Sequence, residues 1–241
     1  MKKRPPQLLL ILFFLLPLCQ LPAQDMSRQE LIDSLAIDYL RSANRDAALY
    51  YGYPPTVAPP ASNHPYLNNN MLFEKGRLSY NHILYPEVML RYDMYSNELV
   101  AMSGARDVVL IPENVDFAEL SGKRIIYFRS DSLPGCPPTG YYFLLNAGKC
   151  LVLEKRTASL LSNTGLAARN SKDNYDIRKV FYLYKEGVYH RIRSQSSLLK
   201  LLQPYRKELK QYISSLGMKY RQYPDLIISF TVDEYEKLTG L

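Results

Sequence analysis

The 241-residue chain contains no tryptophan, three cysteines and three histidines. His64, His82 and His190 lie far apart in the sequence and have no close cysteine or histidine partner, so the ligand spacing of a zinc site is absent. We therefore predict no metal. The lack of tryptophan also weakens a prediction of carbohydrate binding, because sugars would have to stack on tyrosine, and strand propensity accounts for most of the 21 tyrosines.

Motifs of well-known enzymes and cofactor sites are missing as well. The chain has no glycine-x-serine-x-glycine elbow, histidine-glutamate-x-x-histidine helix, phosphate-binding loop or dinucleotide fingerprint. Residues 197–200, SLLK, match the serine-x-x-lysine arrangement of penicillin-interacting enzymes, but the other elements of those enzymes are absent, so helix capping explains Ser197 better. We predict no catalytic residue and no cofactor, and we favour a non-catalytic protein over an enzyme.

The one long apolar run lies at the N-terminus. Leu8–Leu18 follows basic residues at positions 2–4 and ends shortly before Ala23, which is the pattern of a secretory signal peptide. The run has about eleven residues, fewer than the roughly 20 that a membrane-spanning helix needs. We therefore expect residues 1–23 to be a signal peptide, the mature chain to be exported to the periplasm or outer envelope, and no transmembrane segment to remain. A lipid anchor on Cys19 stays open as an alternative.

Two cysteines, Cys136 and Cys150, remain in the predicted mature chain. In an oxidising compartment they could form a disulfide, and closing a loop of about 15 residues would stabilise the fold by about 3 kcal/mol. Two separate buried thiols are an equal alternative.

Alternating side chains predict a β-meander in residues 76–100. Val88, Leu90 and Tyr92 alternate with more polar neighbours, a period of two that places one set of side chains on each face of a strand. The polar residues 159–176 are expected to form a mobile loop or a disordered insertion. Further strands are expected at residues 108–111, 123–129, 141–145, 150–153, 180–184 and 188–192.

The same strand and turn residues carry a resemblance to a known group. The segments GRLSY at 76–80, YPEVMLRYD at 85–93, NELV at 97–100 and YLY at 182–184 resemble small exported proteins of unknown function from Bacteroidota. The resemblance covers most of the mature chain and implies a fold and an exported location. It brings no catalytic residues.

A helix is predicted before the strands. Ser27 and Glu30 fit a capping box, and apolar residues at helical spacing indicate an amphipathic helix from Arg28 to Leu40, with its apolar stripe packed on the β-domain. Residues 50–70, rich in proline and asparagine, exclude a regular element and form a long irregular connection.

A helical pair is predicted after the strands. Ser196 or Ser197 caps its first helix, which Pro204 kinks or divides, and a second helix begins near Pro224. The expected fold is therefore α+β, an antiparallel β-meander, half-barrel or sandwich-like, with an N-terminal helix and a C-terminal helical pair. The expected division is 1–23 signal peptide, 24–70 N-terminal helix and Pro/Asn-rich loop, 71–193 antiparallel β-domain, and 194–241 C-terminal helices packed on that domain.

Charge is distributed unevenly along the chain. Residues 178–223 hold eleven lysines and arginines against two glutamates, which gives this stretch a charge of +9. Such a surface attracts anionic partners, so we predict an exported, non-catalytic cell-envelope protein that binds an envelope protein or an anionic lipid or polysaccharide. Nucleic acid is not expected because of the location. The alternatives are a basic face that is merely solvated, and a cell-envelope hydrolase or small-ligand-binding protein with an unrecognised site. The predicted binding residues are Arg191, Arg193, Arg206, Lys207 and Lys210.

Overall fold

The computed structural model describes residues 27–43, 49, 51–103, 106–133, 135–162 and 172–240. The predicted signal peptide and the alternative anchor at Cys19 lie outside these residues. Within them, no helix is long and apolar enough to cross a membrane.

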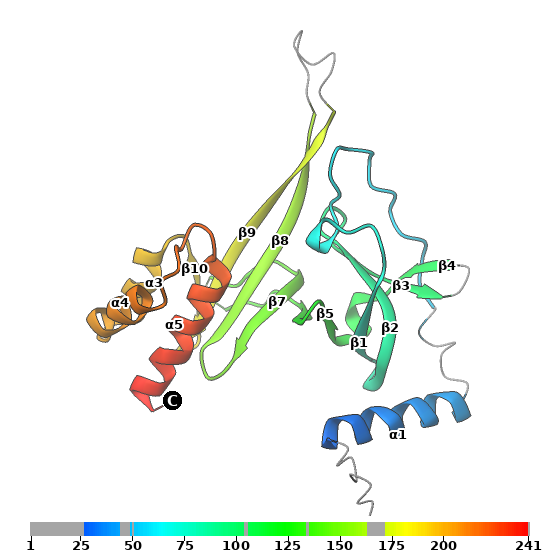
Figure 1. Ribbon diagram of the computed structural model, residues 1–241, viewed down its shortest axis with the longest axis horizontal. Coiled ribbons are helices and arrows are strands. Elements are labelled where there is room, and N and C mark those ends of the chain that lie inside the picture. The colour runs from blue at the N-terminus through cyan, green and yellow to red at the C-terminus, as the bar shows by residue number, and fades with distance from the viewer. Residues whose placement is uncertain are drawn as a thin grey trace, which may run out of the picture.

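The described residues form one antiparallel sheet of ten strands with helices beside it, which confirms the predicted α+β class (Figure 1). The sheet is curled but is not a closed barrel. Its strands are β1 (Glu74–Tyr80), β2 (Ile83–Asp93), β3 (Glu98–Ser103), β4 (Arg106–Val109), β5 (Val115–Leu120), β6 (Lys123–Phe128), β7 (Gly140–Ala147), β8 (Leu151–Leu161), β9 (Asn174–Lys185) and β10 (Val188–Ile192). The helices are α1 (Arg28–Ala43), α3 (Gln195–Leu201), α4 (Arg206–Ser215) and α5 (Pro224–Thr239), with short 3-10 turns at Leu67–Asn69 and Pro112–Asn114.

The strand order β10-β9-β8-β7-β6-β5-β1-β2-β3-β4 consists of two meanders joined where β1 pairs with β5. Several of the hairpins are closed by two-residue turns. Ser121-Gly122 and Glu186-Gly187 have positive φ at both residues, the geometry whose twist matches that of antiparallel strands. Sequence reasoning missed β5, although its VDFAEL alternation and the Ser121-Gly122 turn are typical of a strand and its hairpin.

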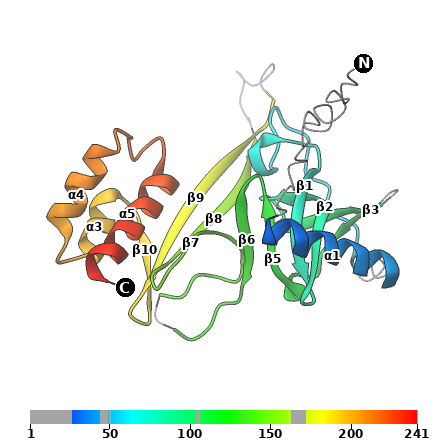
Figure 2. The ribbon, with the colours of Figure 1, turned by 60° about the horizontal axis from the view of Figure 1, so that its bottom comes forward.

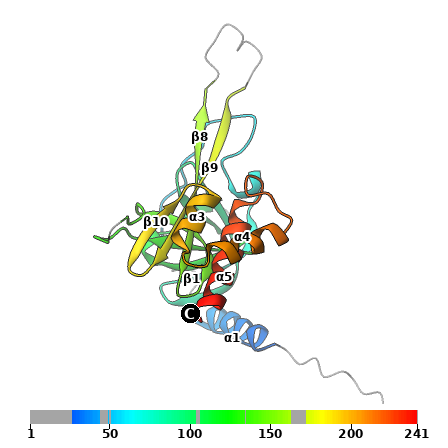
Figure 3. The ribbon, with the colours of Figure 1, turned by 90° about the vertical axis from the view of Figure 1, so that its left-hand side faces the viewer.

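The β8–β9 hairpin is longer than predicted. Residues 159–161 and 174–176, which were expected to be a loop or disordered insertion, pair in register as strand (Figure 3). The rest of that expected loop, residues 163–171, lies outside the described residues. The prediction was wrong at both ends because only Leu160 and Tyr175 in these segments pack on the first core, and this alternation is too short for the pattern to detect.

One face of the sheet carries two apolar cores. The curled part encloses the first core, where the Tyr92 ring lies edge-on to Tyr141 and Phe143 at centroid distances of 6.0 and 5.7 Å. The C-terminal helices cover the second core (Figure 2). β8 supplies Val152 to the second core and Ala158 to the first. The intervening residues of the same parity, 154 and 156, therefore lie where the two cores meet.

The irregular segment 51–73 links the curled sheet to the β8–β9 hairpin. The Asn63 side chain donates to the Tyr175 carbonyl at 2.9 Å and accepts from the Tyr175 amide at 2.7 Å, so it substitutes for a neighbouring strand. The Tyr175 hydroxyl donates to the Pro59 carbonyl at 2.7 Å. These contacts give the proline-rich connection a structural role.

The N-terminal helix does not pack as expected. The capping box is present, since Ser27 and Glu30 exchange hydrogen bonds of 2.7 and 3.2 Å. However, the predicted apolar stripe points away from the sheet, with Leu31 47% and Leu35 61% exposed. The face toward the sheet instead carries Asp33, which accepts from Arg77 at 2.9 Å. The expectation of apolar packing was wrong because helical periodicity identifies a stripe but not what covers it.

At the other end, Pro204 divides the predicted first helix into α3 and α4, one of the two expected outcomes. Ser194, and not Ser196 or Ser197, caps α3, and Ser197 reaches back as the N3 residue of a capping box. This contact accounts for the serine of the SLLK match. The Ser197 hydroxyl donates to the Ser194 carbonyl at 2.7 Å.

Candidate functional site

A cavity of about 230 Å³ opens at the edge of the sheet, between the β9–β10 hairpin and the segment that leads into α5. Among the described residues that line it, three are cationic and none is acidic. The lining residues are Lys179, Val180, Phe181, Arg191, Ile192, Arg193, Tyr220 and Pro224. We call this cavity the cationic pocket.

The end of β10 places two arginines at this pocket. The Glu186-Gly187 turn sets a register in which Ile192 lies opposite Phe181, and both side chains belong to the second core. Because Ile192 is buried, Arg191 and Arg193 on either side of it remain at the surface. The Arg193 amide also donates to Ser197 Oγ at 3.0 Å, which ties the end of the strand to the start of α3.

The two arginines of the pocket are not committed to acidic neighbours. Neither Arg191 nor Arg193 forms an ion pair with another residue in the described part of the chain. Burial raises the pKa of the Tyr220 hydroxyl to about 12, so this group is protonated at neutral pH and can donate a hydrogen bond. The pocket therefore offers positive charge and donors to a ligand.

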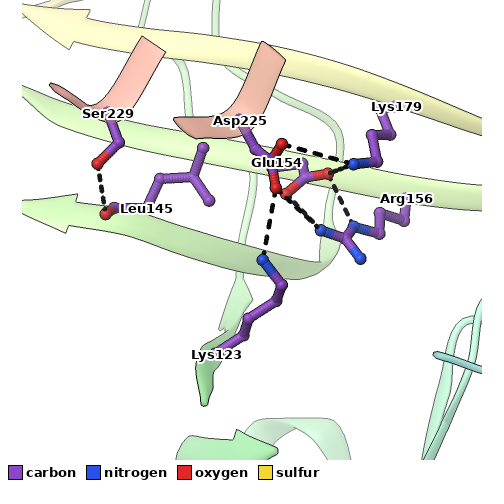
Figure 4. Close-up of polar contacts among 7 residues, drawn as sticks. All are labelled: Lys123, Leu145, Glu154, Arg156, Lys179, Asp225 and Ser229. Carbon is purple, nitrogen blue, oxygen red and sulfur yellow. Dashed lines mark hydrogen bonds and ion pairs between the residues drawn. The ribbon is translucent and has the colours of Figure 1, made fainter. Parts of the chain in front are cut away.

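A buried ion cluster adjoins the pocket at the junction of the two cores (Figure 4). Glu154 is fully buried and accepts from Arg156 through two contacts, of 2.7 Å from Nε and 2.9 Å from a terminal nitrogen. The Arg156 guanidinium also lies 4.4 Å from the centre of the Phe143 ring. Two opposite charges at i and i+2 on β8 thus face the same side of the strand.

Asp225, in the first turn of α5, completes the cluster from the helical side. Its carboxylate lies 3.4 Å from Lys123 Nζ, 3.8 Å from Lys179 Nζ and 3.8 Å from a terminal nitrogen of Arg156. Burial alone would raise the pKa of this carboxyl, but Lys179 and Lys123 outweigh burial and hold the pKa below its ordinary value. Asp225 also suits the helix N-terminus, whose dipole favours negative charge.

Lys179 belongs to both the cluster and the pocket. Its ammonium lies 3.5 Å from Glu154, while its side chain, 35% exposed, lines the cavity. The cluster contains three cations and two carboxylates, a net charge of +1. Arg191 and Arg193, which form no ion pair among the described residues, raise this to +3. Positive charge therefore concentrates where the cavity opens.

The predicted binding residues separate into two groups. Arg191 and Arg193 meet at the cationic pocket. Arg206, Lys207 and Lys210 lie exposed on α4 and do not line the cavity. The structure therefore joins two of the five residues with Lys179 and leaves the other three on a solvated helix face.

Cys136 and Cys150 do not form a disulfide in the structure. Both thiols are free. Cys150 is buried in the second core beneath the C-terminal helices, whereas Cys136 packs beside Tyr142 and Tyr189 on the opposite face of the sheet. Of the two alternatives, the structure therefore has separate thiols and no disulfide, because the sheet itself lies between the two residues.

Sequence reasoning missed Lys179, Tyr220 and the ion cluster. Lys179 was visible only as one of many cations in the stretch 178–223. A signal for the cluster did exist, since Glu154 and Arg156 interrupt the apolar face of a strand with opposite charges two residues apart. No feature of the sequence links Lys179, or Glu154 and Arg156, to Asp225. Only the packing of α5 brings Asp225 near these residues.

Comparisons with protein-family models, with curated protein sequences and with solved structures find no match to this chain. The similarity to exported proteins of Bacteroidota therefore stays a prediction from the residues quoted for it. What the site can do is derived from its own geometry.

Proposed function

We propose that this chain is an exported cell-envelope protein that binds an anionic component of the envelope without transforming it, and that the cationic pocket is where it binds. The observation that supports this most is the meeting of Lys179, Arg191 and Arg193 at one cavity whose described lining contains no carboxylate. Export is supported by the signal-peptide pattern of residues 1–23.

The size of the cavity restricts the ligand. Pockets for drug-sized molecules usually enclose about 300–1,000 Å³, and this one encloses about 230 Å³. At roughly 30 Å³ per water, the space holds about eight waters, enough for a phosphate or carboxylate group with a small attached ring. We infer that the pocket takes a compact charged group, either free or at the end of a larger envelope molecule.

The chemistry of the lining suits such a group. A guanidinium presents a planar fork of donors that matches phosphate and carboxylate oxygens, and neither pocket arginine is engaged by an acidic neighbour in the described chain. Lys179 adds a point charge, and Tyr220 adds a neutral donor. These features favour recognition of an anion over catalysis, for which no described residue of the lining supplies a nucleophile poised beside a base.

Isothermal titration with inorganic phosphate and with glucose 6-phosphate tests this proposal. We expect saturable binding that weakens as salt rises, and we expect Arg191→Ala with Arg193→Ala to weaken it at least tenfold, since each lost charge-assisted hydrogen bond is worth about 1.5–3 kcal/mol. Arg206→Ala with Lys207→Ala on α4 removes the same charge and is the matched control, with binding unchanged. Equal losses in both variants, or no binding by the unaltered protein, would contradict the proposal.

A further inference from the structure

The outward face of α1 carries an apolar stripe that the described chain leaves uncovered. Leu31, Ile32 and Leu35 are 47%, 41% and 61% exposed. At 100° per residue these side chains fall on one side of the helix, opposite Asp33, which faces the sheet and contacts Arg77. Contiguous apolar side chains exposed on a protein surface often mark an interaction surface.

The stripe has a self-complementary sequence. Arg28, Leu31, Leu35 and Asp38 follow one another at spacings of three, four and three residues, the spacing of the contact seam between paired helices. The order of spacings is the same in both directions along the chain. If a second α1 lies antiparallel to the first, Leu31 of each copy therefore contacts Leu35 of the other, which gives two leucine contacts.

The same arrangement pairs the charges. In the antiparallel register that joins Leu31 to Leu35, Arg28 lies opposite Asp38 of the other copy, and the two-fold axis repeats the pair at the far end. Both residues are exposed, and neither forms an ion pair within the described part of the chain. The stripe thus has two apolar positions in its centre and opposite charges at its ends.

We propose that α1 is a homodimerisation surface, on which a second copy of this chain docks antiparallel through Leu31 and Leu35, with Arg28 and Asp38 fixing the register. A lipid surface fits the stripe less well, because helices that lie on membranes carry many lysines and arginines beside their apolar face, whereas Asp38 lies within this one. A helix of 16 residues is about 24 Å long, so the contact is small and the dimer is reversible.

Sedimentation velocity of the protein produced from the full-length sequence, over a range of concentrations, measures the dimer directly. Leu35→Glu should weaken association at least tenfold, because it places carboxylates in the centre of the seam. The matched control is Leu72→Glu, which makes the same change at a leucine that is 73% exposed outside α1 and should leave association unchanged. Circular dichroism confirms that each variant keeps its fold.

Charge reversal tests the antiparallel register. Arg28→Glu alone sets two carboxylates against each other at both ends of the dimer, and Asp38→Arg alone sets two guanidiniums against each other, so each single variant should associate less than the unaltered protein. An equimolar mixture of the two variants restores opposite charges at both ends and should recover association.

Three results would overturn the proposal. The first is that the unaltered protein stays monomeric at every concentration. This includes the case in which the monomer binds phosphatidylglycerol vesicles through Leu35. The second is a dimer that Leu35→Glu leaves intact. The third is a mixture of the two charge variants that associates no better than either variant alone. None of these outcomes depends on ligand binding at the cationic pocket.

Discussion

Replacing Glu154 with glutamine removes the buried carboxylate that holds the ion cluster together. Glu154 is fully buried, and Arg156, which contacts it at 2.7 and 2.9 Å, has a side chain only 9% exposed. Breaking a buried pair by removing one partner typically costs about 3–5 kcal/mol, because the other charge is left uncompensated. Since Asp225 and the Phe143 ring still contact the arginine, we expect the lower end of that range, about 3 kcal/mol.

An exposed ion pair on the neighbouring strand provides the matched control. Asp176 and Arg178 are also two residues apart on a strand and 2.8 Å from each other, but their side chains are 38% and 69% exposed. Because exposed pairs contribute about 0–1 kcal/mol, Asp176→Asn should cost less than about 1 kcal/mol. The two pairs therefore share their spacing and have similar closest contact distances, and they differ in burial and in the second hydrogen bond that Glu154 accepts.

Urea unfolding followed by circular dichroism measures both free energies. A loss of about 3 kcal/mol also corresponds to a melting temperature lower by roughly 6–12 °C in a chain of this size. If Glu154→Gln costs no more than Asp176→Asn, the cluster does not hold the two cores together and the reasoning is refuted.

Two further predictions concern pH and thiol chemistry. Because the folded-state pKa of Asp225 lies below its ordinary value of 3.8, its contribution to stability is present above that value and is lost as pH falls below it. Unfolding measured between about pH 5 and pH 2 should therefore show a smaller acid loss in Asp225→Asn than in the unaltered protein, and parallel curves would contradict this. Cys150 is 2% exposed, and burial raises the pKa of its thiol, with Glu236 adding to the effect. Iodoacetamide should modify Cys136 first in the native protein, and equal rates at both thiols would argue against the described packing.

Much of the sheet could be predicted from local pattern. The strands that face a core on one side show a period of two, and the turns between them contain residues suited to positive φ, as at Glu186-Gly187. Prediction from apolar periodicity failed where burial does not impose a regular alternation of apolar and polar residues. Only Leu160 and Tyr175 in the outer parts of β8 and β9 face the core, and the stripe on α1 is covered by nothing in the described chain.

The candidate site was only partly visible in the sequence. Charge bias along residues 178–223 drew attention to Arg191 and Arg193, but it could not separate them from the cations of α4. The cationic pocket exists because β9, β10 and the start of α5 come together, and the sequence separation of Lys179 and Tyr220 hides that contact. Composition can therefore predict a basic region, whereas only the fold determines which of its side chains meet.

Nuclear magnetic resonance of the arginine side chains during a titration with inorganic phosphate tests the central claim most directly. The Nε–Hε signals of Arg191 and Arg193 should shift together and saturate with one dissociation constant, while the signal of Arg206 on α4 stays in place. A titration in which neither pocket arginine responds, or in which Arg206 shifts in parallel with them, would contradict the assignment of an anion site to the cationic pocket.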